Sequence, residues 1–128
     1  RAFHRQAQRA VFEHADYAEI MGGARPGDVI YCDPPYVPLS SSANFTSYSA
    51  GGFSIEQQKQ LAQLARNTAD RGIPVLLSNH NTELIRHIYK EAGADCGRAF
   101  SVQRYISCNG KQRMCASELL AFFSQEQP

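Results

Sequence analysis

A strand-like run that stops at two prolines constrains this chain more than any other feature. Residues 29–32 are apolar, β-branched or aromatic, which is typical of a strand buried on both faces of a sheet. Asp33, Pro34 and Pro35 follow directly, and a Pro-Pro pair cannot continue a sheet because neither residue donates a backbone hydrogen bond. Pro34 also restricts Asp33 to an extended conformation. The sequence therefore predicts a fixed carboxylate at the end of a buried strand, with the Pro34 carbonyl beside it and the Tyr36 ring beyond.

Strand-like and helix-like patterns alternate along the chain, which predicts an α/β fold with helices packed on a sheet, all within one domain of residues 1–128. We expect, in order, the tail of a helix at 1–9, a strand at 10–15, a short helix at 17–21 broken by glycines, a turn at 25–28, the strand at 29–32, a helix at 55–70, a strand at 73–78 and a helix at 83–92. Ser54 with Gln57 forms a capping box before the longest helix. Strands at 100–107 and 117–123 are expected to close the sheet as an antiparallel hairpin around Asn109-Gly110.

Three polar residues are expected at one edge of this sheet. Ligands of open α/β sheets bind at the carboxyl ends of parallel strands. Asp16, Asp33 and Asn79 each follow a predicted strand, so the pattern favours a common site. Residues 37–52 are rich in Ser, Asn, Thr and Gly and show no hydrophobic period, and a loop of this length is usually functional or disordered.

Composition leaves most function classes open. Lys and Arg number 13 against 12 for Asp and Glu, so the charge balance neither supports nor excludes a nucleic-acid partner. No apolar run approaches the roughly 20 residues of a membrane span, and no secretory leader is visible, so we expect a cytoplasmic protein without a membrane partner. The four cysteines form no C-x-x-C pair, which predicts reduced thiols and no metal site.

The arrangement around Asp33 suits a planar aromatic amine. The lone pair of such an amine is delocalised into its ring, and two acceptors on its N–H bonds draw it toward a tetrahedral, nucleophilic geometry. The Asp33 carboxylate and the Pro34 carbonyl are two such acceptors, while Tyr36 could stack on the ring with a gain of about 1–3 kcal/mol. Positioning would then supply much of the rate of group transfer. The alternative for a bare Pro-Pro-Tyr is an ordinary loop start without a function.

Residues 30–36 resemble the D-P-P-Y motif of amino-methylating DNA methyltransferases. The chain is similar to the C-terminal part of the Dam-type adenine methyltransferases along nearly its whole length. Four further segments resemble family segments in the same order, at residues 14–17, 43–48, 78–82 and 104–110. One departure is Asn81, where the relatives tend to have Asp. The expected fold is therefore the C-terminal half of a Rossmann-like, S-adenosylmethionine-dependent methyltransferase sheet.

The resemblance implies transfer of a methyl group from S-adenosylmethionine to adenine N6 in duplex DNA, at a GATC-like site, with the base flipped out of the helix. It implies that Asp33, Pro34, Pro35 and Tyr36 are catalytic, and that Asp16, Tyr17 and Asp33 bind the donor. For Asp16 alone, a helix N-cap is an equal alternative. The residues implied to contact substrate or DNA are Tyr36, Asn44, Phe45, Thr46, Tyr48, Asn79, Arg104, Asn109, Lys111 and Arg113.

Two parts of the family pattern are missing, namely the glycine-rich donor loop and the target-recognition region. Gly22-Gly23 and Gly51-Gly52 are the two glycine pairs, and neither follows a strand and opens a helix. One interpretation is a partial catalytic domain that is weak or inactive alone and pairs with an N-terminal half. A second is a non-catalytic remnant that binds or self-associates through a sheet edge. A third is a protein-amide methyltransferase, although those enzymes more often have Asn at the position of Asp33.

Overall fold

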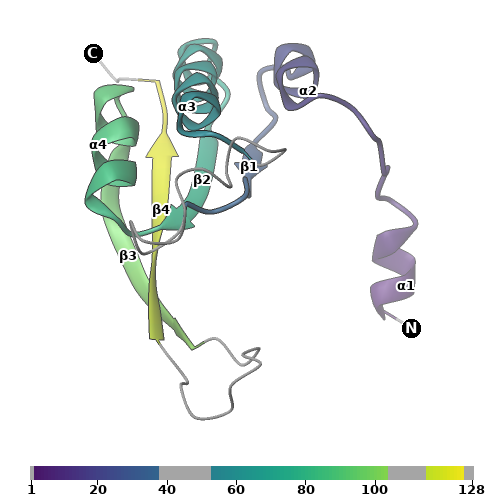
Figure 1. The fold of residues 1–128 in the computed structure, drawn as a ribbon. Coiled ribbons are helices and arrows are strands. Elements are labelled where there is room, and N and C mark those ends of the chain that lie inside the picture. Colours follow the sequence, from purple (N-terminus) through teal and green to yellow (C-terminus); the bar gives the residue numbers. More distant parts are fainter. Residues whose placement is uncertain (1, 38–52, 104–114, 126–128) are drawn as a thin grey trace.

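The computed structural model describes residues 2–37, 53–103 and 115–125, and it has the predicted α/β character (Figure 1). Its elements are α1 (Ala2–Ala7), α2 (Tyr17–Gly23), β1 (Ile30–Cys32), α3 (Ile55–Asp70), β2 (Val75–His80), α4 (Glu83–Glu91), β3 (Asp95–Gln103) and β4 (Cys115–Phe123). None of these described helices combines the length and the apolar character that crossing a membrane requires.

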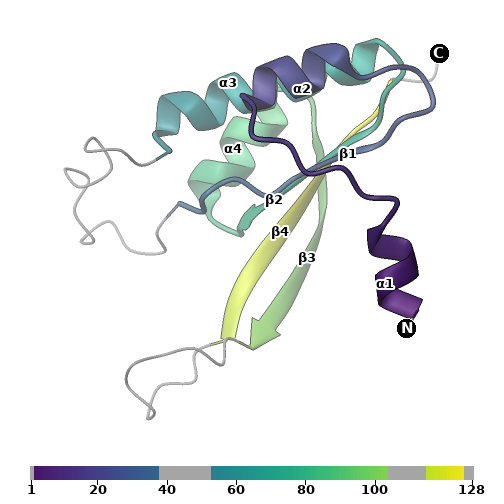
Figure 2. The same ribbon diagram turned by 90° about the vertical axis from the view of Figure 1, so that its right-hand side faces the viewer.

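The four strands form one sheet in the order β1-β2-β4-β3. β1 and β2 are parallel, so their carboxyl ends meet at the same edge, whereas β4 is antiparallel to both β2 and β3. β3 and β4 extend as a two-stranded ribbon past the end of β2, which stops where His80 pairs with Glu118 (Figure 2). The connection between β3 and β4 lies outside the described residues, so the hairpin turn at Asn109-Gly110 stays a prediction.

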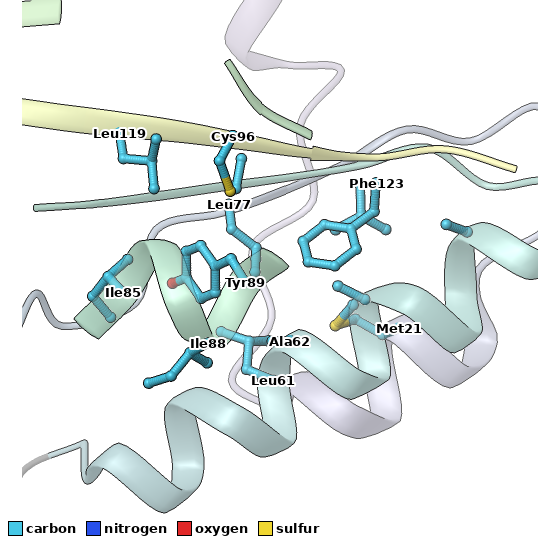
Figure 3. Packing of buried hydrophobic residues seen from close by; sticks show 14 residues of the cluster. Met21, Leu61, Ala62, Leu77, Ile85, Ile88, Tyr89, Cys96, Leu119 and Phe123 are labelled. Carbon is cyan, nitrogen blue, oxygen red and sulfur yellow. The ribbon is translucent and has the colours of Figure 1, made fainter. Parts of the chain in front are cut away.

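Helices α2, α3 and α4 all lie on one face of the sheet (Figure 2). The core fills the space between these helices and the strands, with Tyr89 and Phe123 as its largest side chains (Figure 3). Its members are Met21, Leu61, Ala62, Ala65, Ala69, Val75, Leu77, Ile85, Ile88, Tyr89, Cys96, Leu119, Ala121 and Phe123. α1 stands apart from this core at the end of an extended segment (Figure 1).

The predicted bounds of α3 are confirmed, and local sequence explains them. The Ser54 hydroxyl accepts a hydrogen bond from the Gln57 backbone N–H at 3.1 Å, and the Ser54 N–H donates to Gln57 Oε1 at 2.8 Å. This reciprocal pair satisfies two N–H groups that have no partner within the helix. The helix ends before Gly72, whose φ of +84° reverses the chain toward β2. Capping therefore fixes where the helix starts, and burial of one stripe fixes which face meets the sheet.

Replacing the capping hydroxyl should weaken the fold by a measurable amount. We expect Ser54→Ala to lower the free energy of unfolding by about 1 kcal/mol, because the Gln57 N–H loses its acceptor. Urea denaturation followed by circular dichroism measures this difference. Ser101→Ala on the exposed surface of β3 is the control and should change stability little. Equal stability of the two variants would contradict a stabilising role for the cap.

The predicted strand at residues 10–15 is wrong. The segment is extended but pairs with no other strand in the described part of the chain, and Val11 and Phe12 are 81% and 90% exposed. Its short apolar run thus lacks the neighbouring strand that a place in a sheet requires. In addition, α2 continues through Gly22 and Gly23 instead of breaking before them. Asp16 consequently precedes a helix and does not end a strand.

Other strand predictions also differ from the structure, and β3 begins at Asp95 instead of residue 100. β2 continues through Asn79 and His80, which had been assigned to a loop, because both residues keep their register with β4. β1 is not buried on both faces, since Val29 and Tyr31 are 68% and 61% exposed. Within the described residues β1 pairs with β2 alone, and no helix covers the face on which Tyr31 lies. β1 is therefore an edge strand with one open side.

Candidate active site

Asp33 lies where the sequence predicts it, directly after β1, and one neighbour orients its side chain. The Ser78 hydroxyl of β2 is 2.7 Å from Asp33 Oδ1 and donates to it, and it also lies 3.4 Å from the Cys32 carbonyl. Ser78 is buried whereas Asp33 is exposed. No described residue donates a hydrogen bond to the second carboxylate oxygen of Asp33. The site therefore presents a carboxylate that is fixed through one oxygen and open through the other.

The two proline carbonyls have different surroundings. Gln58 of α3 donates from Nε2 to the Pro35 carbonyl at 2.9 Å. Across the described ranges, the Pro34 carbonyl receives no hydrogen bond, although Pro34 is buried. The Gln58 amide thus holds the Pro35 carbonyl and leaves the Pro34 carbonyl without a described donor, and the predicted contact of Pro34 with substrate stays a prediction.

Tyr36 is half-buried beside β2 and β4. Its ring meets the His80 ring edge-on, with 5.0 Å between centroids and 76° between planes, and its hydroxyl donates a long hydrogen bond of 3.5 Å to Glu118 Oε2. Burial is the main cause that raises the pKa of Tyr36, the Ser78 hydrogen bond opposes it, and the Glu118 and Asp33 charges add to it. Tyr36 therefore stays a neutral phenol, which suits a ring that stacks on a base.

Beneath this segment lies a polar cluster with no exposed surface, formed by Gln58, Asn79 and Tyr89. Asn79 had been predicted to contact substrate, but its burial and its bonds within the protein place it as a support. Its Oδ1 accepts from the backbone N–H of Val37 at 3.2 Å and from that of His80 at 2.9 Å. In the structure Asn79 therefore supports the backbone beside the site, and its predicted contact with substrate stays a prediction.

Sequence reasoning missed the other supporting residues. Gln58 lies three residues before Leu61 on the buried stripe of α3, and a polar residue on an apolar stripe was the available signal. Ser78 was read only as the end of a strand, although residues 76, 78 and 80 of a strand share a face. His80 had been given no role, yet its Nδ1 lies 2.6 Å from the Val37 carbonyl. No sequence pattern pointed to that contact.

The two residues predicted on the donor side lie at the start of α2. Asp16 Oδ1 accepts from the Ala18 N–H at 2.8 Å, so Asp16 is the N-cap of the helix, and its side chain stays exposed. The Tyr17 ring packs edge-on against Phe53, with 5.9 Å between centroids. Burial is the main cause that raises the pKa of Tyr17, and the Asp16 charge adds to it. In the described part of the chain, neither Asp16 nor Tyr17 bonds to Asp33.

Several predicted DNA-contacting residues lie outside the described residues and remain predictions: Asn44, Phe45, Thr46, Tyr48, Arg104, Asn109, Lys111 and Arg113. Within the described ranges, no three His, Cys, Asp or Glu side chains gather as they would around a metal ion.

Cys32, next to Asp33, should be chemically inert in the folded protein. Burial raises the pKa of its thiol to about 11, so at pH 8 only about one thiol in a thousand is a reactive thiolate. We expect iodoacetamide to modify Cys32 far more slowly in the native chain than in urea, as followed by mass spectrometry of the peptide. Glutathione in the same tube controls for reagent activity. Equal rates of Cys32 modification in the native chain and in urea would show that the thiol is exposed to solvent.

Comparison with known proteins gives a consistent result. The D12 class N6 adenine-specific DNA methyltransferase family matches residues 1–103. A DNA adenine methylase of Vibrio cholerae is 48% identical over 123 residues, which are 95% of this chain and 43% of that protein. A DNA adenine methylase of Escherichia coli K12 is 46% identical over 121 residues, which are 94% of this chain and 42% of that protein.

A DNA adenine methylase of Serratia marcescens is 43% identical over 122 residues, which are 94% of this chain and 44% of that protein. The chain thus spans less than half the length of the curated relatives it matches, and the match includes the whole Asp-Pro-Pro-Tyr site. With a carboxylate, an open carbonyl and an aromatic ring in the order that the family motif requires, this chain belongs to the D12 class N6 adenine-specific DNA methyltransferases.

Proposed function

We propose that this chain forms the amine-binding side of an active site that transfers a methyl group from S-adenosylmethionine to adenine N6 in duplex DNA. The observation that carries the proposal is the pair of open acceptors at the end of β1. Asp33 is fixed by Ser78 through one oxygen, and the Pro34 carbonyl receives no hydrogen bond from any described residue. An exocyclic amine has two N–H bonds, and these two acceptors can take one each.

Each residue of the motif has a separate task in this proposal. The Asp33 carboxylate and the Pro34 carbonyl accept from the amine and favour its tetrahedral form. The negative charge of Asp33 also stabilises the positive charge that develops on the nitrogen, which is the kind of preorganised electrostatic effect that dominates many active sites. Pro35 keeps the exit from β1 rigid, and Tyr36 stacks on the base.

The proposed donor side consists of Asp16, Tyr17 and Asp33. S-adenosylmethionine supplies, when bound, a methyl group activated by the positive charge on its sulfur. An adenosyl group offers hydroxyl and amino donors beside a planar ring, and the residues present fit these features. Asp16 keeps an exposed carboxylate while it caps α2, and Tyr17 with Phe53 provides an aromatic pair beside it. Asp33 belongs to both sides of the proposed site, whereas Asp16 and Tyr17 belong to the donor side alone.

DNA is the proposed substrate because the relatives are named as DNA adenine methylases. An adenine amine lies inside the stacked duplex, so the base must flip out to reach Asp33. A GATC-like target and DNA contacts come from the resemblance to the family, and a cytoplasmic location completes the proposal. The proposed DNA contacts are Asn44, Phe45, Thr46, Tyr48, Arg104, Asn109, Lys111 and Arg113.

The exposed edge and face of the sheet at β1 support a second part of the proposal. The matched relatives contain segments outside the region that they share with this chain, and such a methyltransferase segment would complete the site. β1 is an edge strand of the described sheet, and Val29 and Tyr31 lie exposed on or beside it. Exposed strand edges and apolar faces favour association. We propose that the complementing segment covers this face and brings the glycine-rich donor loop opposite Asp33.

A complementation assay tests both parts. Transfer of labelled methyl groups to a GATC duplex is measured for this chain alone, for an N-terminal segment of the Vibrio cholerae relative alone, and for their mixture. We expect methylation from the mixture and little or none from either part. The mixture made with Asp33→Ala should be inactive, and a duplex without adenine in the target should not be labelled.

The other interpretations predict different results. A non-catalytic remnant would give no methylation in any mixture and would sediment as a self-associated species. A protein-amide methyltransferase would label protein acceptors offered alongside DNA and leave the DNA unlabelled. Either pattern would replace the proposed function.

A further inference from the structure

We infer that Gln58, Asn79 and Tyr89 form a buried positioning network that sets the orientation of Tyr36 by holding the peptide groups on both sides of it. The three residues come from α3, β2 and α4, which pack together behind the Asp-Pro-Pro-Tyr segment. This inference rests on the proposed function for its catalytic meaning, but the geometry that it describes belongs to the protein alone.

The two peptide groups that flank the Tyr36 Cα atom are each held by a buried amide. Gln58 Nε2 donates to the Pro35 carbonyl at 2.9 Å, which fixes the peptide before Tyr36. Asn79 Oδ1 accepts from the Val37 N–H at 3.2 Å, which fixes the peptide after it. The planes of these two peptides define φ and ψ of Tyr36, because a trans peptide is rigid and only two backbone angles per residue are free. The direction in which the Tyr36 side chain leaves the backbone therefore depends on the side chains of Gln58 and Asn79.

The two amides are themselves joined, so they act as one unit. Asn79 Nδ2 donates to Gln58 Oε1 at 3.2 Å and to the Tyr89 hydroxyl oxygen at 3.0 Å, and the Tyr89 hydroxyl donates to Gln58 Oε1 at 3.1 Å. Burial, the largest cause, raises the pKa of Tyr89 to about 12, so its hydroxyl remains a donor at neutral pH. Every buried side-chain polar atom among the described residues has a partner, as such a closed network requires.

Only one orientation of the two amides satisfies these contacts. If the Gln58 amide were turned over, its NH₂ group would face the NH₂ group of Asn79 and its oxygen would face the Pro35 carbonyl. The same reasoning applies to Asn79, whose oxygen already accepts two backbone N–H groups. The network is therefore a directed chain of donors and acceptors that ends on the backbone beside Tyr36. Side chains that only filled space in the core would not need a fixed order of donors and acceptors.

The experiment compares substitutions inside the network that do and do not touch the segment. Gln58→Met keeps the length of the side chain but removes the donor to Pro35, and Gln58→Asn keeps the amide but is too short to reach it. Tyr89→Phe removes one hydroxyl from the same buried cluster without touching the segment. Gln63→Met, on the exposed side of the same helix, is the matched control. Urea denaturation of each variant shows which ones are folded and how much stability they lose.

Two measurements report on Tyr36 without any catalysis. Nuclear Overhauser contacts between the Tyr36 and His80 rings report the ring direction, and hydrogen exchange of the Val37 N–H reports the second anchor. We expect both Gln58 variants to weaken the ring contact and to speed Val37 exchange by about tenfold relative to other protected amides. Gln63→Met should leave both unchanged, and Tyr89→Phe should change them less than the Gln58 variants do. A folded Gln58 variant with an unchanged ring contact and unchanged exchange would overturn the inference.

Methyl transfer by the complemented enzyme adds the functional readout. We expect kcat/KM for the DNA substrate to fall by about tenfold in the Gln58 variants while the KM for S-adenosylmethionine stays the same. A shifted Tyr36 ring with unchanged kcat/KM would also overturn a positioning role. If the unmodified mixture shows no methyl transfer, the proposed function fails, while the ring contact and the Val37 exchange still decide whether the network holds Tyr36.

Discussion

Replacing Asp33 with alanine should reduce the kcat of methyl transfer by about 10³-fold, a loss of the size seen when one preorganised electrostatic contact is removed. In the proposed function, the substitution removes both an acceptor and a negative charge from the place where the amine becomes positive. It also leaves the Ser78 hydroxyl without its acceptor at 2.7 Å. Asp33 is exposed, so its loss should leave the fold intact. Methylation of a GATC duplex by the complemented enzyme measures the effect.

Asp33→Asn separates the two contributions of this side chain. The amide keeps one neutral acceptor but carries no charge, so we expect activity between that of Asp33→Ala and that of the unmodified chain. Glu91→Gln removes an exposed charge from the end of α4 and serves as the control. DNA binding, measured by fluorescence anisotropy, should be similar in all four proteins. A loss of less than about tenfold for Asp33→Ala would remove Asp33 from the catalytic centre.

Replacing Phe123 with alanine should cost the fold about 3–5 kcal/mol, the range for removing a buried aromatic ring. Phe123 has no exposed surface and pairs with Val75 of β2 at the centre of the sheet. Many domains are stable by only about 5–15 kcal/mol, so this loss would leave a large fraction of the chain unfolded under mild denaturant. The midpoint of urea unfolding measures it.

Phe122 provides a matched control on the same strand. Successive side chains of a strand point to opposite faces, so Phe122 lies on the face away from the helices, where it is 39% exposed. Phe122→Ala should therefore cost much less than Phe123→Ala in the isolated chain. If the open face binds a complementing segment, Phe122→Ala should instead weaken complementation. Equal losses of stability for the two variants would mean that the face is covered in the chain itself.

The sequence predicted elements well where local patterns decide them. The capping box of Ser54 and Gln57 fixed the start of α3, and the proline pair fixed the end of β1. Asp33, Pro34 and Tyr36 were predicted as the site because one short segment carries their geometry. The predictions failed where the secondary structure of a segment depends on pairing with another strand of the chain. Residues 10–15 begin with an apolar run that favours a strand, but they pair with no other strand in the described part of the chain. Asn79 and His80 were assigned to a loop, but they pair with β4.

The supporting residues could not be predicted for the same reason. Gln58 and Tyr89 take their roles from contacts across the core, and no spacing in the sequence shows that their polar atoms meet. Asn79 was predicted to contact substrate from the resemblance to the family, and no sequence pattern showed that its side chain bonds to Gln58 and Tyr89 of the helix layer. A local sequence pattern can place a polar residue at the edge of a sheet. Only the packing shows whether its side chain faces the substrate or the helix layer.

The network behind Tyr36 also determines when during folding the motif acquires its shape. Pro35 and Gln58 are 23 residues apart, and Val37 and Asn79 are 42 apart. Bonds across such distances form only after the intervening loops have closed, and this closure is slow compared with the formation of a single helix. In a nascent or partly folded chain, the residues of the Asp-Pro-Pro-Tyr motif are therefore present but are not yet held in the geometry of the folded site. If the proposed function holds, the ability to bind an amine appears only together with the completed core.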